Sequence, residues 1–168
     1  MKRIRFLLSL GIVATLILAL IPVSAVLAAK PTIVGPYTFS ISQDVEGICT
    51  FPIHIDAVIT GRDINFTDQN GALVRISSHT DQQDTFSANG KTLVGLPYTY
   101  EMDFRFDSSG NIISIRATGI IEKVPLPDGS LYISAGWLDF TSRFPTMVIQ
   151  ADRGNPGNLA GLCAALAP

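Results

Sequence analysis

The fold of this chain is decided by residues 98–106, which read Tyr98-Thr99-Tyr100-Glu101-Met102-Asp103-Phe104-Arg105-Phe106. Apolar and polar side chains alternate along the whole stretch. Because successive side chains of an extended strand point to opposite faces of a sheet, this pattern predicts a strand with one buried and one solvated face. The aromatic residues and Met102 would lie on the buried face, and the charged residues on the other.

Two other segments show the same two-residue period. One has apolar residues at the odd positions from Phe51 to Ile59, and the other has them at the odd positions from Ile113 to Ile121, with a glycine at 119. The even positions are mostly polar, and Glu122 is expected on the solvated face. Three such stripes predict a protein built from β-strands.

Turn sequences separate the apolar stretches. Asn89-Gly90 suits the positive φ angles of a type I′ turn, and residues 68–71, 107–111 and 127–129 are similar Asp- and Gly-containing clusters. We therefore expect an all-β antiparallel meander. Its long central strands favour closure into a small barrel, with a β-sandwich as the alternative. The expected strands are residues 32–42, 48–60, 63–67, 72–78, 85–88, 91–95, 98–107, 111–124, 130–141 and 145–150.

Residues 1–28 are predicted to be a secretory signal peptide. Basic residues at 2, 3 and 5 precede an apolar run, and small residues follow around Ala28. Cleavage after Ala28 would release residues 29–168 as a single secreted β domain. The alternative is an uncleaved leader that anchors the protein in the membrane with the domain outside, because the apolar run approaches the length of a membrane span.

The charge balance of residues 29–168 argues against two classes of partner. Without the leader, nine basic residues face 14 acidic ones, a net charge of −5, and the basic residues form no cluster. Nucleic acids and anionic membranes both require clustered Lys and Arg. We therefore expect no nucleic-acid partner, and no membrane partner after leader removal.

Cys49 and Cys163 are the two cysteines of the chain. In an oxidising compartment they are expected to form a disulfide, with a reactive thiol as the alternative. Neither has a second Cys or a His at metal-ligand spacing, so we expect no metal and no cofactor.

The last residues predict a short helix. Leu159, Leu162, Cys163 and Leu166 share one helical face, and Asn158 is placed to cap it. A helix this short is not stable alone. We expect the disulfide to hold it to the first long strand, and the helix to cover the outer face of the strand at 131–140.

Two short motifs carry a resemblance. Cys49-Thr50-Phe51-Pro52 opens a strand, and Gly161-Leu162-Cys163-Ala164-Ala165-Leu166 lies at the end of the chain. With the leader and the Gly- and Asp-rich turns, they resemble small secreted proteins of Gram-positive soil bacteria. The resemblance supports the β fold and the disulfide, but it transfers no catalytic residue.

The favoured function is non-enzymatic binding or interaction. Small antiparallel barrels often hold an apolar ligand, and five residues are candidates to line such a cavity: Tyr98, Tyr100, Met102, Phe104 and Trp137. The same side chains would otherwise fill a packed core. In that case an extracellular protein is the expected partner, bound through exposed loops such as residues 77–84.

No residue is predicted to be catalytic. His54 and Asp56 share a strand face, but that face is expected to be solvated. His79 lies in a polar loop, and Glu101 and Asp103 are followed by Arg105, which suggests a surface charge pattern. The alternative function is an extracellular hydrolase or isomerase with a site around His54 or His79.

Overall fold

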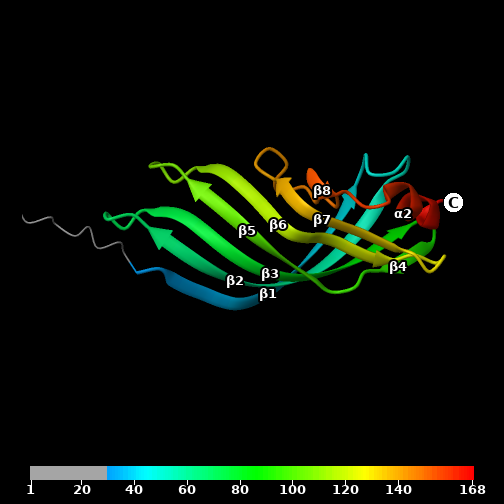
Figure 1. The fold of residues 1–168 in the computed structure, drawn as a ribbon, viewed down its shortest axis with the longest axis horizontal. Helices are drawn as coiled ribbons and strands as arrows, with labels where there is room; N and C mark the ends of the chain where they lie inside the picture. The colour runs from blue at the N-terminus through cyan, green and yellow to red at the C-terminus, as the bar shows by residue number, and fades with distance from the viewer. Residues whose placement is uncertain (1–29) are drawn as a thin grey trace, which may run out of the picture.

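The computed structural model describes residues 30–168, which form an eight-stranded antiparallel sheet and a short C-terminal helix (Figure 1). The predicted signal peptide lies outside the described residues. The elements are β1 (Thr32–Val45), β2 (Ile53–Thr67), β3 (Leu73–Ala88), β4 (Lys91–Val94), β5 (Tyr98–Phe106), β6 (Ile112–Pro125), β7 (Leu131–Asp139), β8 (Arg153–Asn155) and α2 (Leu159–Leu166).

The strands pair almost entirely in chain order. The sheet runs β1-β2-β3-β5-β6-β7-β8, and β4 forms a hairpin with the end of β3. The predicted all-β class, the antiparallel meander and the short C-terminal helix are confirmed. The expected closure into a barrel does not occur in the described residues, because the edge strand β1 pairs with neither β7 nor β8. Residues 140–152 lie outside the strands, so the strand expected at 145–150 is absent, and β8 was not foreseen.

β2 and β3 are each one continuous strand where two separate strands were expected. In β2 the expected break fell near Gly61, but this glycine stays in the ladder and the Tyr37 ring lies against it. In β3 the expected exposed loop at residues 77–84 is a central part of the strand, paired with β2 on one side and β5 on the other. The loop prediction failed because polar side chains occupy both faces of this segment.

The helix α2 lies at one end of the curled sheet (Figure 1), where it packs against an apolar core. Leu162 and Leu166 are completely buried among residues of the strand ends, including Ile53, Phe86 and Tyr132. Tyr132 points inward, so the expectation that the helix covers the outer face of residues 131–140 was wrong. The helix closes the end of the sheet because both of its buried leucines belong to the interior core.

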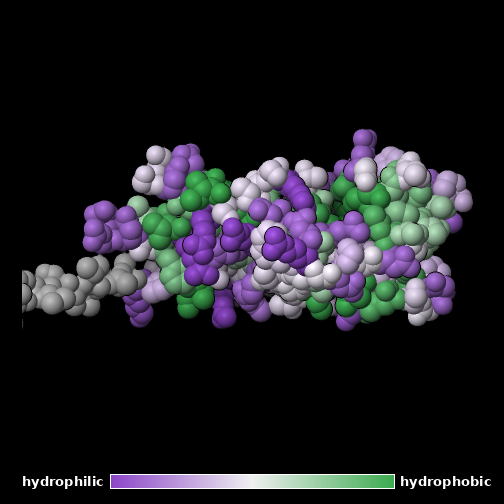
Figure 2. Space-filling view, turned by 45° about the horizontal axis from the view of Figure 1, so that its top comes forward, coloured by the Kyte–Doolittle hydropathy of each residue, from purple (hydrophilic) through white to green (hydrophobic). Residues whose placement is uncertain are grey.

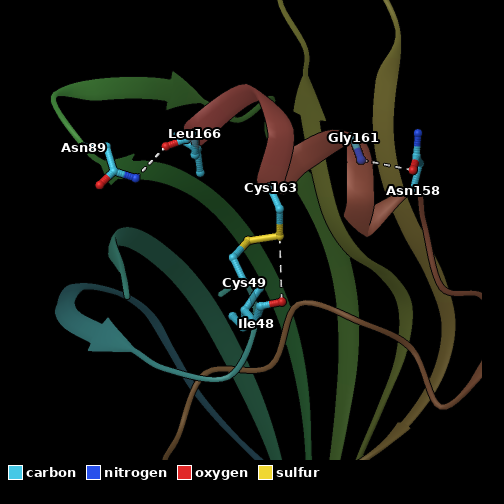
Figure 3. The surroundings of a disulfide bond; sticks show 7 residues. All are labelled: Ile48, Cys49, Asn89, Asn158, Gly161, Cys163 and Leu166. Atoms are coloured by element: carbon cyan, nitrogen blue, oxygen red, sulfur yellow. Dashed lines mark hydrogen bonds between the residues drawn. A yellow bond between two sulfur atoms is a disulfide. The ribbon is translucent and has the colours of Figure 1, made fainter. Parts of the chain in front are cut away.

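The disulfide between Cys49 and Cys163 is formed as predicted (Figure 3). It joins residues 114 positions apart in the chain, with their Cα atoms 5.6 Å apart. The Asn158 side chain accepts a hydrogen bond from the Gly161 N–H at 3.1 Å, which confirms the predicted cap. Asn89, in the β3–β4 turn, donates a 2.9 Å hydrogen bond to the Leu166 carbonyl at the other end of the helix.

The outer surface is mixed in character. On the face seen in Figure 2, hydrophilic side chains dominate the middle of the molecule and hydrophobic ones reach the surface toward both ends. Within residues 30–168, no helix has the length and apolar character needed to span a membrane.

Candidate ligand-binding pocket

The inward faces of β1, β2, β3, β5, β6 and β7 surround a pocket of about 310 Å³. Residues from the irregular segment after β7, among them Phe144 and Ile149, complete its wall. Phe39 and Phe144 line the pocket and are about half exposed, so the pocket reaches the surface. Its volume is at the lower end of the range for small-molecule sites.

Four of the five predicted ligand-contacting residues line this pocket: Tyr98, Tyr100, Met102 and Phe104. All four come from β5, whose alternation places them on one face. The Tyr98 and Tyr100 rings are stacked with centroids 6.0 Å apart, and Phe104 meets Phe144 edge-on at 6.4 Å. The wall of the pocket is therefore aromatic and largely apolar.

Trp137, the fifth predicted residue, does not line the pocket. It lies on the opposite face of β7 from the buried Leu138. The Arg116 and Arg153 guanidinium groups lie 5.9 and 5.5 Å from its ring centroid, a cation–π arrangement. The prediction that Trp137 lines the cavity was wrong, because both faces of β7 are apolar and the sequence pattern does not reveal which face points inward.

The inner part of the pocket carries a polar cluster that was not predicted. Gln82 donates from Nε2 to both oxygens of Asp84, at 2.8 and 3.0 Å. Tyr98 donates its hydroxyl to Asp84 at 2.6 Å, and Tyr100 donates to Gln82 Oε1 at 2.7 Å. The hydrogen-bond donors of Gln82, Tyr98 and Tyr100 are thus paired with acceptors within the cluster. Such pairing allows polar side chains to be buried in an interior of low dielectric constant.

Glu122 completes this cluster from β6. The β6–β7 register shifts between Ile120 and Glu122, so that Ile121 and Glu122 are both buried although they are adjacent in the chain. Such a β-bulge redirects a side chain to the other face of a strand. The prediction that Glu122 lies on the solvated face was therefore wrong, since it assumed an unbroken two-residue period.

Burial dominates the ionisation of the polar cluster. It raises the pKa of Glu122 well above the usual value, and the negative charge of Asp84 raises it further. Burial is also the main cause of the raised pKa values of Tyr98 and Tyr100. At neutral pH both tyrosines are hydrogen-bond donors, and burial shifts the ionisation of Glu122 toward its uncharged form.

The rim of the pocket is organised around Tyr37. Its hydroxyl donates to Asp63 Oδ1 at 2.7 Å and lies 3.2 Å from Ser78 Oγ. Burial raises the pKa of Tyr37 as well. The ionisable carboxyl groups lining the pocket are Asp63, Asp84 and Glu122, and no Lys, Arg or His lines it.

The two histidines lie on the outer face, away from the pocket. His54 Nδ1 is 2.8 Å from Asp44 Oδ1, and its Nε2 is 3.1 Å from Ser42 Oγ. The hydrogen bond with Asp44 raises the pKa of His54. His79 pairs with Glu101, and Asp103 pairs with Arg75 and Arg105. These charged groups are partly exposed; all of the pairs join neighbouring strands except Asp103–Arg105, which lies within β5. None of these groups lines the pocket.

Gln82, Asp84 and Glu122 were missed for different reasons. Ser78, Thr80, Gln82 and Asp84 form a polar stripe with the two-residue period, a signal that was present in the sequence but indicates solvent exposure by itself. Glu122 carried no local signal, because the bulge that turns it inward depends on pairing with β7.

The fold and site define an all-β protein whose curled, open antiparallel sheet encloses an apolar pocket with a polar inner end. Comparison of the chain with protein-family models, curated proteins and solved structures finds no match.

Proposed function

We propose that this is a secreted, non-enzymatic protein that binds one small, largely apolar molecule in the pocket. The observation that carries the proposal is the hollow interior: the aromatic stripe of β5 surrounds a space of about 310 Å³ that a solid core would fill. Well-packed interiors rarely leave voids larger than a water molecule. A space of this size with a few converging polar groups is typical of ligand sites.

Secretion is the compartment that best fits the remaining features. The disulfide requires oxidising conditions, and the N-terminal residues have the composition of a secretory leader. The resemblance to small secreted proteins of Gram-positive soil bacteria supports the same proposal.

The first test is native mass spectrometry of the protein purified from the medium of the producing cells. A reproducible added mass, present in the native spectrum and absent after denaturation, would support a bound molecule. The denatured, unreduced mass also tests leader removal and the loss of two hydrogens in the disulfide. A bare monomer that also binds no member of a library of small apolar molecules would contradict the proposal.

A matched pair of variants on β5 locates the bound molecule. Met102→Trp fills the pocket and should abolish the added mass, whereas Glu101→Trp places the same ring on the outer face and should leave it unchanged. Circular dichroism and the melting temperature verify that both variants fold. Loss of the added mass in both variants, or in neither, would place the molecule outside the pocket.

A second function, acid–base catalysis, is favoured by one observation. Glu122 is a carboxyl group with a raised pKa in a pocket, which is the usual setting of a general acid. An isomerase of this kind would release a chemically altered molecule. Recovery of an unchanged ligand after prolonged incubation would support binding alone.

A further inference from the structure

Glu122 and Asp84 form a pair of buried carboxyl groups. Glu122 Oε1 accepts a 2.8 Å hydrogen bond from the Lys123 N–H, and the Glu122 carboxyl also shares a hydrogen bond with the Asp84 side chain, which raises the pKa of Glu122. Apart from Asp84, Glu122 Oε2 has no hydrogen-bond partner. The Glu122 side chain is completely buried and lines the pocket. Because two adjacent buried carboxyl groups cannot both be ionised without a counter-charge, this pair requires either a shared proton or a cationic partner.

The groups around Glu122 are acidic or neutral. Asp84 faces it from β3, Tyr98 and Tyr100 from β5, and Tyr132 from β7. No basic side chain among the residues that line the pocket balances the carboxyl groups of Asp84 and Glu122. A pocket with this lining disfavours an anionic ligand and stabilises a cationic one.

The rings of the pocket wall add a second preference for positive charge. Tyr98 and Tyr100 lie next to the carboxyl groups, and Phe104 lies further along the same strand. The faces of aromatic rings attract cations, most strongly where water is excluded. Met102 and Phe104 also provide apolar contact for a hydrocarbon chain.

We propose that the bound molecule is a small hydrophobic amine in its ammonium form, with its N–H donating to Glu122 Oε2 beside Asp84. Its hydrocarbon part lies along the β5 wall toward the mouth of the pocket. This inference rests on the proposed function and names the chemical class of the ligand.

The proposal includes a balanced proton exchange. In the empty pocket, burial and the charge of Asp84 favour the protonated Glu122 carboxyl. When the ammonium enters, that proton leaves to solvent, and the resulting carboxylate accepts the ammonium hydrogen bond. One positive charge enters and one leaves, so the pocket keeps its net charge.

The test is isothermal titration calorimetry at pH 7 with three probes of equal chain length: octylamine, octanol and octanoate. Octylamine should bind at least about tenfold more tightly than octanol, because a charge-assisted hydrogen bond adds to the same hydrocarbon contacts, and octanoate should not bind. Repeating the octylamine titration in buffers of different ionisation enthalpy should reveal proton release on binding.

Variants connect this preference to Glu122. Glu122→Gln should weaken octylamine binding by at least about tenfold, abolish the proton release and retain octanol binding. Glu101→Gln, on the outer face, should change none of these quantities.

The outcomes separate the two proposals. If octanol or octanoate binds as tightly as octylamine, or if Glu122→Gln leaves octylamine binding unchanged, the amine inference is wrong and the pocket remains a binding site. If none of the three probes binds and the native spectrum shows no added mass, both proposals fail.

Discussion

Tyr98 on β5 donates a 2.6 Å hydrogen bond to Asp84 on β3, and both side chains are buried. Removing the hydroxyl leaves Asp84 buried with one donor fewer. We expect Tyr98→Phe to lower the free energy of unfolding by about 1–3 kcal/mol, measured by urea denaturation.

Thr99→Val is the matched control for this variant. Thr99 donates an equally short hydrogen bond to Asp81, but on the exposed face of the same strand pair. Its loss should change stability by less than about 0.5 kcal/mol. Equal losses of unfolding free energy in the two variants would show that the buried Tyr98 hydrogen bond contributes no more to stability than the exposed Thr99 hydrogen bond.

Glu122 should make the protein less stable as the pH rises. The unfolded chain releases this proton near the ordinary Glu pKa of about 4.3, whereas burial raises the pKa in the folded state. Between these two pKa values the folded state binds more protons, so raising the pH through this window favours unfolding. Glu122→Gln should remove this dependence and be more stable than the parent protein above the window.

Chemical denaturation at several pH values measures this difference. Glu101→Gln, which changes an exposed carboxyl group on β5, provides the comparison and should retain the pH dependence of the parent protein. If the stability of Glu122→Gln depends on pH as strongly as that of the parent protein, the pKa of Glu122 is not raised by folding.

The disulfide should hold α2 in place. The helix has eight residues, too few for stability in water without tertiary contacts. Replacing both cysteines in Cys49→Ser/Cys163→Ser should lower the unfolding free energy by about 2–5 kcal/mol. Hydrogen exchange should increase most strongly in Leu159–Leu166.

Reduction of the parent protein serves as the control for the serine substitutions. It should reproduce the same loss of stability without changing any side chain other than the two cysteines. Undiminished protection of α2 in the double variant would show that Leu162 and Leu166 suffice to hold the helix.

Gly136 should tolerate no side chain. Its φ is +144°, and an added Cβ would lie 2.0 Å from the Arg153 carbonyl oxygen in β8. We expect Gly136→Ala to separate β8 from β7, visible as faster hydrogen exchange in Arg153–Asn155.

Gly110→Ala measures how much stability is lost through a positive φ alone, without a steric clash. Gly110 also has a positive φ, +82°, but a Cβ there meets no atom within 4 Å. This variant should lose about 1–2 kcal/mol from the left-handed backbone alone, and Gly136→Ala should lose more. Equal losses would exclude the close strand approach as the reason for glycine at 136.

The strand pattern was predictable wherever one face is apolar and the other polar. β5 follows its predicted bounds closely, and the odd positions of β2 from Ile53 to Ile59 are buried as expected. The central part of β3 was missed because it is polar on both faces. Its inward residues are stable there because β5 supplies the hydroxyl groups of Tyr98 and Tyr100, a contact between strands that no local pattern reveals.

Local periodicity, turn residues and the count of cysteines were enough to predict the all-β class, the order of the main strands, the capped C-terminal helix and the pairing of Cys49 with Cys163. The open sheet, the outward direction of Trp137 and the inward direction of Glu122 could not be predicted in this way. The face on which a side chain lies depends on strand register and on bulges, and both are set by pairing between strands that are distant in the chain. The charge and polarity of the pocket therefore arise from contacts between distant residues.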